Sequence, residues 1–393
     1  RALVRRHPRF YGEGLRVANR TDFKKIEIGA LIAGGGIAGS ALFRYMSDAG
    51  LNPVLVNADR GSSWRNIGGG RTAFSLPELA EIAEHNHAIF KELQKISNID
   101  YKTTRYINLA HDESTFNALD ASRAWSDAFM VDPKNFHKEI SPYFSTKSKR
   151  YLGALITNDC WQATPGKVVD LIRNMGVSAG GRIVEDCKVL EVMKEGSTYS
   201  ILVLTHDKKY VEFRTEIFVN ALGAGAGKIC EGLGIHAGLY PVRHQAFITR
   251  RLPMLGKNGD SLDMLIDRQE YKGFSAVYGQ QLLHTGQIIG CASPRVDALR
   301  TDKNLILNTK EFMEIVSEFF VDWMPELAGV SIQATWSGYY TEPRYIVDPE
   351  LGLFVGMRGH GFMLSQYLAK IYVDKLMGRP VPEYFDQLKL NGP

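Results

Sequence analysis

Three closely spaced glycines are the first residues in this sequence whose types and spacing could do chemistry. Gly34, Gly36 and Gly39, within "AGGGIAG", fit the pattern G-x-G-x-x-G. In such a loop the first glycine permits a tight turn, the second lets the backbone approach a pyrophosphate, and the third lets the helix pack on the strand. The positive N-terminus of that helix faces the phosphates. The pattern therefore predicts a dinucleotide-binding loop.

The end of the next strand departs from what such a loop usually requires. An acid about 20 residues after the glycines normally accepts hydrogen bonds from ribose hydroxyls. Here that place is taken by Asn57, with Asp59 two residues later. The amide oxygen of Asn57 can accept a hydrogen bond but carries no charge. We expect a dinucleotide site that lacks the usual carboxylate at this position.

The elements around the loop agree with a parallel nucleotide-binding fold. "KIEIGALIAGG" (25–35) is an apolar, strand-like run, and "IAGSALFRYMSDAG" from Ile37 has apolar residues at helical spacing. Gly50 ends the helix, and "NPVLVNA" (52–58) is a short buried strand. This strand, helix, strand order predicts a parallel sheet.

Further along the chain, segments typical of a parallel α/β domain alternate with segments typical of an antiparallel sheet. Helices are expected over 77–96, after Pro165, over 309–324 and at the end of the chain, while alternating residues between about 245 and 293 indicate an antiparallel sheet. We therefore predict an α/β protein with interleaved domains: a Rossmann-like cofactor domain from 26–90, 150–235 and 331–393, and a mainly antiparallel β-sheet substrate domain from 91–149 and 236–330. Residues 1–25 form a basic N-terminal arm.

Composition excludes several other classes. The 393 residues carry a net charge of +4 with scattered basic residues, which gives no support for nucleic-acid binding. The four cysteines lie far apart without a CxxC pair, so we expect reduced thiols and no metal site. No apolar run reaches the roughly 18 residues of a membrane span. We expect a soluble protein of the cytoplasm or mitochondrial matrix; the basic arm could be the remnant of a transit sequence, a docking arm or simply where the fragment begins.

Several blocks in a fixed order resemble the superfamily of D-amino-acid oxidase, glycine oxidase and sarcosine oxidase. Besides the glycine loop they are "GSSWRNIGGGR" (61–71), "TPGKVVDLIRNMGVSAGGRIVEDCKV" (164–189), "VNALGAGAGKIC" (219–230), "YPVRHQAF" (240–247) and "VGMRGHGFMLS" (355–365). The resemblance implies FAD as the cofactor. It also implies that Asn57 replaces a family glutamate that binds the adenosine ribose.

The resemblance also implies which residues meet FAD. Val189 matches a residue whose backbone meets adenine, and the turn from Gly359 to Met363 matches one that approaches the flavin ring. The expected cofactor-binding residues are Gly34, Gly36, Ile37, Ala38, Gly39, Asn57, Ala58, Ser63, Trp64, Gly69, Gly70, Val189, Ala221, Gly223, Gly359, Gly361, Phe362 and Met363.

This chain differs from the family pattern where relatives attach the flavin or hold a substrate carboxylate. Arg65 replaces the histidine that binds FAD covalently in some relatives, and no cysteine stands near "WSGYYTEPRY", so we expect non-covalent FAD. Tyr340 replaces a carboxylate-binding arginine, and Met363 replaces a lysine.

Other cations are available to replace these anchors. The catalytic candidates are Arg71, Arg358, Tyr340 and His360, and Arg344 is a weaker candidate. Tyr278, Tyr339 and His244 are further polar groups that could surround the substrate. Strand packing explains Tyr278 equally well, and a histidine on a strand, like His244, is more often a hydrogen-bonded structural residue.

The implied reaction is hydride transfer from the carbon beside an amine to flavin N5, after which water hydrolyses the imine. The substrate would be a small amine, amino acid or imino acid, and the electron acceptor, which could be a protein partner, is open. One alternative is an FAD-binding accessory or assembly subunit with little catalysis of its own. Another is an NAD-dependent enzyme that uses the same first loop.

Overall fold

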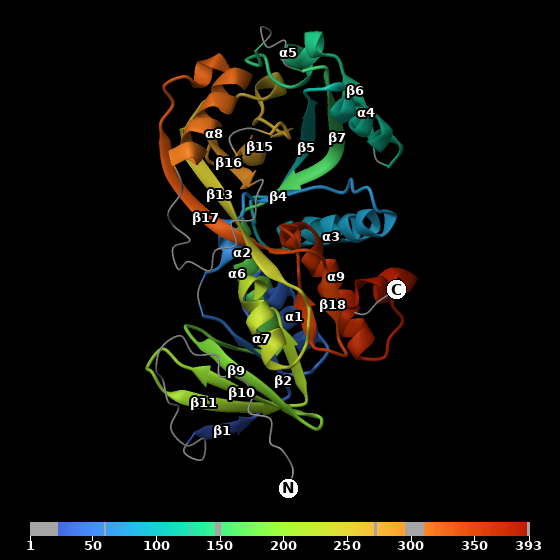
Figure 1. Ribbon diagram of the computed structural model, residues 1–393, viewed down its shortest axis with the longest axis vertical. Coiled ribbons are helices and arrows are strands. Elements are labelled where there is room, and N and C mark those ends of the chain that lie inside the picture. Colours follow the sequence, from blue (N-terminus) through green and yellow to red (C-terminus); the bar gives the residue numbers. More distant parts are fainter. Residues whose placement is uncertain are drawn as a thin grey trace.

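Three β-sheets follow one another along the long axis of the molecule (Figure 1). The computed structural model describes residues 23–58, 60–125, 127–145, 151–270, 273–294 and 310–390. A six-stranded sheet lies at the centre, a nine-stranded sheet at one end and a four-stranded sheet at the other. Most of the expected basic arm, residues 1–22, and Asp59 lie outside the described residues.

The central sheet has the order β18-β19-β12-β2-β3-β8. Its strands are β2 (Ala30–Ala33), β3 (Pro53–Val56), β8 (Arg182–Val184), β12 (Ile217–Asn220), β18 (Ile346–Asp348) and β19 (Leu353–Val355). Every pair is parallel except β18 with β19. The predicted parallel nucleotide-binding unit is therefore confirmed, and its strands come from the beginning, middle and end of the chain.

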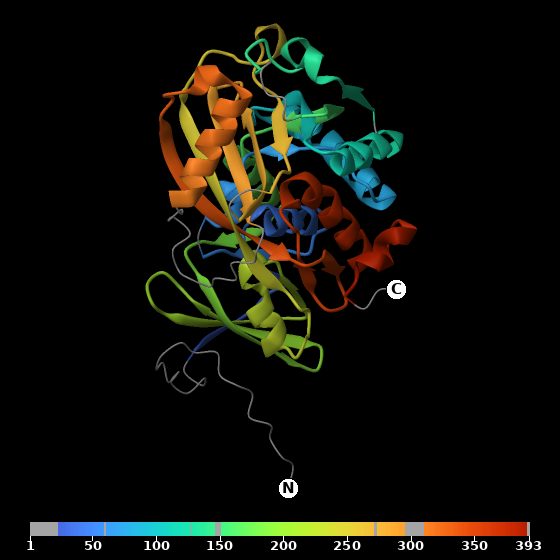
Figure 2. The ribbon, with the colours of Figure 1, turned by 45° about the horizontal axis from the view of Figure 1, so that its top comes forward.

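Helix α1 (Ile37–Asp48) connects β2 to β3 and lies at the centre of the packing. Leu42, Phe43 and Met46 on this helix are fully buried, and each such side chain contributes about 1.5–3 kcal/mol of hydrophobic stabilisation. The helix packs against α6 (Pro165–Ser178) and α9 (Gly361–Leu376), and α3 (Pro77–Ile96) packs on α9. Figure 2 shows the helices of this layer side by side beneath the nine-stranded sheet. These contacts bring the starts of two helices, α1 and α9, together.

The nine-stranded sheet is largely antiparallel, as predicted for 245–293. Its main path is β17 (Ile332–Glu342), β13 (Tyr240–Arg251), β16 (Gln287–Pro294), β15 (Phe274–Gln281), β14 (Met264–Asp267), β5 (Lys102–Ala110), β7 (Gly153–Gln162) and β4 (Gly69–Gly70), while β6 (Ala128–Val131) pairs with β7. Helix α8 (Lys310–Trp323) buries Phe312, Phe319 and Trp323 against it, as its aromatic spacing predicts. Strands β4, β7 and β17 thus tie segments expected in the cofactor domain to this sheet.

The four-stranded sheet has the order β1-β11-β10-β9 and corrects one expected strand. It contains β1 (Lys24–Glu27), β9 (Lys188–Glu195), β10 (Thr198–Leu204) and β11 (Tyr210–Thr215). The run 25–35 is two strands in two sheets, and between them Gly29 passes so close to Leu51 that a Cβ would lie 2.5 Å from its carbonyl oxygen. After α6 the chain likewise forms two strands in two sheets, β8 and β9, and Asp186 between them has φ of 54°. Hydrophobic periodicity does not reveal where one strand ends and another begins.

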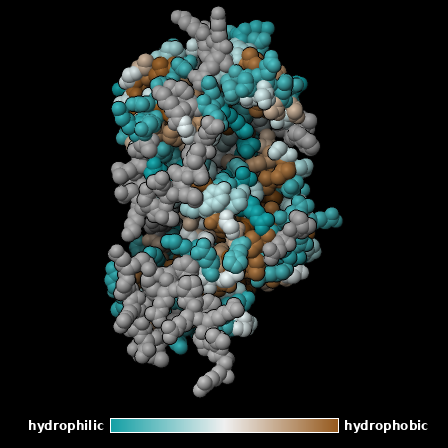
Figure 3. Space-filling model, viewed as in Figure 1, coloured by the Kyte–Doolittle hydropathy of each residue, from teal (hydrophilic) through white to brown (hydrophobic). Residues whose placement is uncertain are grey.

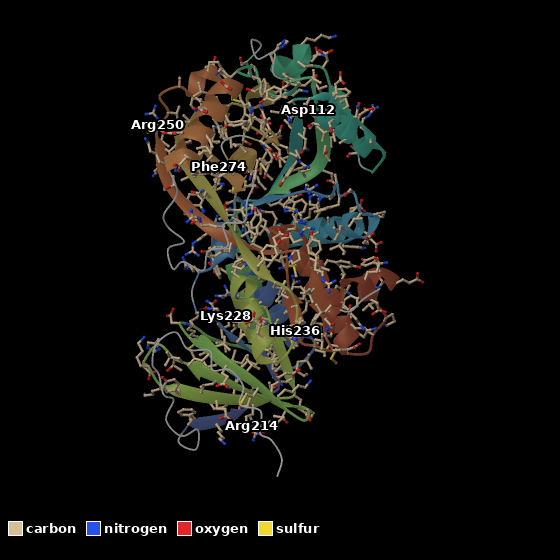
Figure 4. All side chains as sticks on the ribbon, in the orientation of Figure 1. Asp112, Arg214, Lys228, His236, Arg250 and Phe274 are labelled. Atoms are coloured by element: carbon tan, nitrogen blue, oxygen red, sulfur yellow. The ribbon has the colours of Figure 1, made fainter. Side chains whose placement is uncertain are left out.

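The remaining short helices are α2 (Ser62–Arg65), α4 (Glu113–Ala121), α5 (Phe136–Glu139) and α7 (Ala226–Gly232). No helix among the described residues is both long and apolar enough to cross a membrane. Hydrophilic side chains cover much of the face in Figure 3, and apolar residues come to the surface mainly at mid-height, on the side of α9 and β18. Figure 4 shows Arg250 near the end of β13 and His236 near α7.

Candidate active site

The glycine loop joins β2 to α1 in the form that its sequence predicts. Gly34 has φ of 105°, and its amide donates to the carbonyl of Val56 at 2.8 Å. A Cβ at Gly34 would lie 2.4 Å from the carbonyl oxygen of Ala221, which follows β12. Only glycine fits this turn, so the loop lies directly against the second predicted turn, between Ala221 and Gly223.

A serine from α2 completes the start of α1. Gly36, at the N-cap, has no side chain to accept a hydrogen bond from the helix. Instead the backbone amide of Ile37 donates to Ser63 Oγ at 2.8 Å. The hydroxyl therefore lies where the helix dipole is positive, and it can also donate to a phosphate oxygen.

Helix α2 also connects this loop to β17 of the nine-stranded sheet. Ser62 Oγ accepts a hydrogen bond from the amide of Tyr339 at 2.9 Å, and Trp336 Nε1 donates to the carbonyl of Arg65 at 2.8 Å. The segment "SSWR" thus couples the predicted phosphate site to the strand that carries Tyr340. Tyr339 contributes its backbone here.

The end of β3 contains a polar network that the sequence did not reveal. Asn57 is buried; its Oδ1 accepts from the amide of Gly35 at 3.3 Å, and its Nδ2 donates to Glu185 Oε2 at 2.7 Å. Arg173, on α6, holds the other oxygen of Glu185 at 2.6 Å. No local motif marks Glu185 or Arg173, since only the pairing of β3 with β8 and the packing of α6 bring them to the loop.

The other predicted cofactor residues divide into two groups. Val189 packs on the apolar cluster that contains Val56, and Ala58 lies exposed just after β3, so both are near the network at Asn57. Gly69 and Gly70 instead pair with β7, and a Cβ at Gly70 would lie 2.2 Å from Trp161. Packing against Trp161 therefore accounts for Gly70, and a contact of this pair with FAD stays a prediction.

The C-terminal turn brings a second helix start to the first. A Cβ at Gly361 would lie 3.5 Å from Ile37 Cγ2, which places the start of α9 beside the start of α1. Phe362 and Met363 are 4% and 8% exposed, and Phe362 packs edge-on against Phe90 at 5.0 Å. Their side chains belong to the core, and the amide of Met363 donates to the carbonyl of His360 at 3.0 Å, so neither side chain is directed to a ligand and the amides of Gly361 and Phe362 are the donors at the start of α9.

Next to this turn lies a cluster of uncharged aromatic and imidazole groups. Gly359 approaches Tyr340 so closely that a Cβ would lie 2.2 Å from the ring. Tyr340 stacks on His244 with ring centroids 3.6 Å apart, and its hydroxyl lies 3.1 Å from that of Tyr278. Burial lowers the pKa of His244 to about 3 and raises the pKa of Tyr340, so both side chains are neutral near pH 7.

His360 and Arg71 form the second polar part of the site. The Nδ1 of His360 shares a hydrogen bond with the hydroxyl of Tyr345, and the imidazole meets Phe74 edge-on. Burial, with smaller contributions from Arg71 and Arg358, lowers the pKa of His360 to about 3. This candidate is therefore a neutral hydrogen-bonding group near pH 7.

The guanidinium of Arg71 is anchored but not paired with an acid in the described contacts. It lies over the ring of Phe74 at 4.2 Å and donates through Nη1 to the carbonyl of Ala73 at 2.5 Å. Burial, together with the neighbouring Arg268, lowers its pKa. Arg268 was not singled out from the sequence, because a lone arginine after a strand carries no local signal.

The other two candidate arginines are engaged elsewhere. Arg358 Nε pairs with Glu342 Oε2 at 2.9 Å, and its side chain is 46% exposed. Arg344 donates to the carbonyl of Leu390. A contact of Arg358 with substrate or flavin stays a prediction, and Arg71 is the candidate that lies beside His360.

These residues fit a flavin dinucleotide. The start of α1 and Ser63 Oγ offer donors for a pyrophosphate, and the start of α9 and the cluster around Tyr340 lie together at the C-terminal turn that is predicted to approach the flavin ring. Non-covalent binding stays a prediction; Arg65, at the position of covalent attachment, uses its carbonyl to hold Trp336.

Solved structures of similar fold come from amino-acid and imino-acid enzymes. L-Proline dehydrogenase from P. horikoshii superposes with a TM-score of 0.77 at 22% identity, covering 94% of this chain and 97% of that one. Glycine oxidase from Geobacillus kaustophilus superposes with a TM-score of 0.77 at 18% identity, covering 93% and 98%. Iminodiacetate oxidase from Chelativorans gives 0.72 at 15% identity, covering 92% and 98%. These likenesses establish the predicted fold.

Comparison with known sequences identifies the family. Anaerobic glycerol-3-phosphate dehydrogenase subunit A1 from Haloferax volcanii is 26% identical over 240 residues, which is 54% of this chain but only 39% of that protein. A family model described as FAD dependent oxidoreductase, DAO, matches residues 30–375. FAD is therefore the cofactor, and the NAD alternative is set aside. The chain belongs to the DAO family of FAD-dependent oxidoreductases.

Proposed function

We propose that this flavoenzyme oxidises a C–N bond of a small amine, amino acid or imino acid. The observation that carries the proposal is the neutral cluster of Tyr340, Tyr278 and His244 packed against the turn at Gly359. Bound FAD supplies the acceptor for the two electrons and the hydrogen that leave the carbon beside nitrogen.

The cluster suits an amine because it adds no positive charge. A protonated amine holds its lone pair in an N–H bond, so oxidation requires the neutral form. His244, whose pKa is lowered to about 3 by burial, and the two tyrosines can orient such an amine by hydrogen bonding. Water released into the site afterwards hydrolyses the imine to a carbonyl compound and the free amine or ammonia.

Arg71 is the residue that we propose to hold a substrate carboxylate. Its guanidinium stays protonated even when burial lowers its pKa, and its planar fork matches a carboxylate. The amino-acid and imino-acid substrates named for the similar structures support this role. Arg71 would then bind the substrate carboxylate, and Tyr340 would orient the rest of the substrate.

A second candidate is an FAD-binding subunit with little catalysis of its own. The observation in its favour is the ion pair of Arg358 with Glu342, which engages one of the arginines available to bind substrate. The relative from Haloferax volcanii is itself named as a subunit.

Anaerobic titration distinguishes these candidates. The flavin spectrum of the purified protein is followed during addition of glycine, sarcosine, L-proline, D-proline, iminodiacetate, simple amines and glycerol 3-phosphate. Bleaching by an amine or amino acid supports the proposal and identifies the substrate class. Bleaching by glycerol 3-phosphate alone would assign C–O oxidation instead, and a flavin that none of these reduces but dithionite does would favour the subunit.

A further inference from the structure

We infer that Glu185 supplies the carboxylate that binds the adenosine ribose of FAD, in place of the acid missing at Asn57. The inference concerns the cofactor, and it holds whichever substrate the enzyme uses. It rests on a network of Asn57, Glu185 and Arg173 that joins β3, β8 and α6 beneath the glycine loop.

The pairing of two parallel strands places Glu185 beside Asn57. Val56 is in register with Val184, and each strand ends at that residue. The amide of Asn57 also donates to the carbonyl of Val184 at 3.0 Å. Both side chains therefore leave the same carboxyl edge of the sheet, which is where dinucleotides bind in folds of this kind.

Asn57 links the glycine loop to the carboxylate. Its Oδ1 accepts from the amide of Gly35 at 3.3 Å, and its Nδ2 donates to Glu185 Oε2 at 2.7 Å. A glutamate or aspartate at 57 could not donate to Glu185, and two carboxylates would repel one another at that distance. The amide is thus the side chain that Glu185 requires as its neighbour.

Arg173 holds the carboxylate from the other side. Nη1 pairs with Glu185 Oε1 at 2.6 Å, Nη2 donates to the carbonyl of Gly35 at 2.7 Å, and Nε donates to Ser40 Oγ at 3.1 Å. The guanidinium also lies 5.0 Å from the ring of Trp64. Only 9% of the Arg173 side chain is exposed, so Arg173 is held in place where it supports the glycine loop.

The network explains why the glycine loop has a glycine at its variable position. A Cβ at Gly35 would lie 2.0 Å from Arg173 Nη2 and 2.8 Å from the side chain of Asn57. The pattern G-x-G-x-x-G requires nothing special at this position. Gly35, the middle one of the three consecutive glycines, is therefore an adaptation to Arg173 and Asn57.

Glu185 keeps the means to bind a ribose. Each carboxylate oxygen has one partner in the network and accepts more than one hydrogen bond, and 47% of the side chain is exposed. The two hydroxyls of an adenosine ribose are donors that suit these free acceptor positions. Asn57, which is buried and engaged at both ends, is a positioning residue for Glu185.

The experiment measures FAD binding to the apoprotein by quenching of flavin fluorescence. We expect E185Q to bind FAD about 10-fold more weakly, as expected for hydrogen bonds to a charged group, and to bind FMN unchanged. Glu231 on α7 is exposed, so E231Q is the matched control and should leave FAD binding unchanged.

Two further measurements separate ribose binding from a structural role. An FAD analogue whose adenosine carries 2′,3′-dideoxyribose should bind wild type about 10-fold more weakly than FAD, and E185Q should bind FAD and the analogue alike. The double variant N57E/E185Q, which moves the carboxylate to the family position, should bind FAD more tightly than E185Q, whereas N57E alone, which places two carboxylates side by side, should bind FAD more weakly than wild type.

If E185Q binds FAD and the analogue each more weakly than wild type does, and by the same factor, the inference is overturned, because Glu185 would then act only through the loop. Unchanged FAD binding in E185Q would overturn it as well. Should E185Q not fold, E185D is the second variant: it keeps the charge, but its side chain is one carbon shorter and its carboxylate lies farther from the ribose. The ratio of its affinities for FAD and for the analogue should then be smaller than that of wild type. Full discrimination in E185D would count against ribose contact.

Discussion

His244 and Tyr340 stack across two neighbouring strands because the residue opposite His244 is a glycine. In the pairing of β13 with β17, His244 faces Gly338 and Val242 faces Tyr340. With no side chain at Gly338, the ring of Tyr340, two residues farther along, can lie over the imidazole, with centroids 3.6 Å apart and planes 24° apart. Such diagonal neighbours are within reach of aromatic side chains. The stack therefore positions a phenol beside the turn at Gly359.

Replacing Tyr340 by Phe should reduce activity without unfolding the protein. The ring can still stack on His244, but the hydroxyl that lies 3.1 Å from that of Tyr278 is lost. One hydrogen bond is worth about 0.5–1.5 kcal/mol, so kcat/KM for the best substrate should fall about 3- to 10-fold. Tyr143, which is 40% exposed, gives the control Y143F. Equal activity of Y340F and wild type would remove Tyr340 from the substrate site.

Two histidines with lowered pKa values should make the protein less stable in mild acid. The pKa values of His244 and His360 are lowered to about 3, below the value of about 6.5 in an unfolded chain. Between these values the unfolded chain binds protons that the folded chain does not. The free energy of unfolding is therefore unaffected by these groups above about pH 6.5 and falls as the pH drops towards 3, by up to about 1.4 kcal/mol per pH unit for each histidine.

Urea unfolding at about pH 7.5 and about pH 5.5 measures this slope. The variant H244Q should show a shallower decrease than wild type, because one of the two buried imidazoles is gone. His236 is exposed, near α7 (Figure 4), and H236Q should retain the wild-type slope. If H244Q and wild type lose the same free energy over this pH range, His244 is not a buried neutral group.

The sequence predicted the elements of the cofactor fold because their signals are local. The glycine pattern specified the turn at Gly34 and the helix after it, and Pro77 and Pro165 marked helix starts that the structure confirms. Helical periodicity likewise identified the buried face of α8. In each case the residues that determine the element lie within a few positions of one another.

The sequence did not predict the network at Asn57, since its partners are remote. Glu185 is 128 residues away along the chain and Arg173 reaches Gly35 across 138. The absence of an acid at 57 was visible, but the replacement depends on which strand lies next to β3, and that is decided by packing. The ion pair of Arg358 with Glu342 is a similar case, since it depends on the turn after β19 meeting the end of β17.

The role proposed for Arg71 predicts a loss confined to substrates that carry a carboxylate. Lysine retains the charge but not the planar fork, so R71K should raise KM for an amino acid about 10- to 100-fold. This range corresponds to the loss of a charged hydrogen bond, which is worth about 1.5–3 kcal/mol. KM for the corresponding amine without the carboxylate should stay the same. Arg250, exposed near the end of β13 (Figure 4), supplies the control R250K. Parallel losses for both substrates would show that Arg71 acts on the fold or the flavin instead.

Denaturation should release all of the FAD from this protein. Arg65 stands where some relatives carry the histidine that bonds to the flavin, and a guanidinium does not form that bond. After precipitation with trichloroacetic acid, the flavin absorbance should therefore be recovered in the supernatant, with none in the pellet. Chromatography of the supernatant should identify FAD. Flavin fluorescence that stays with the denatured chain on a gel would contradict this expectation.

An alanine at Gly35 should test how tightly the glycine loop and Arg173 are packed. The new Cβ would lie 2.0 Å from Arg173 Nη2, and the guanidinium cannot move without releasing Glu185 and Ser40. Overpacking of this kind costs about 1–3 kcal/mol, so G35A should lower the midpoint of thermal unfolding.

The control and the rescue for this variant follow from the same geometry. At Gly225, φ is −86° and the nearest heavy atom to a Cβ would lie at 3.8 Å, so G225A should be tolerated. Combining G35A with R173A removes the closer of the two clashes and leaves the one with Asn57 at 2.8 Å, and the double variant should lose less stability than the sum of the two single variants. If the loss of stability in the double variant equals the sum of the two single losses, Gly35 is required by the turn alone. If it is smaller than that sum, Arg173 is what requires a glycine at position 35, as its hydrogen bonds to the loop imply.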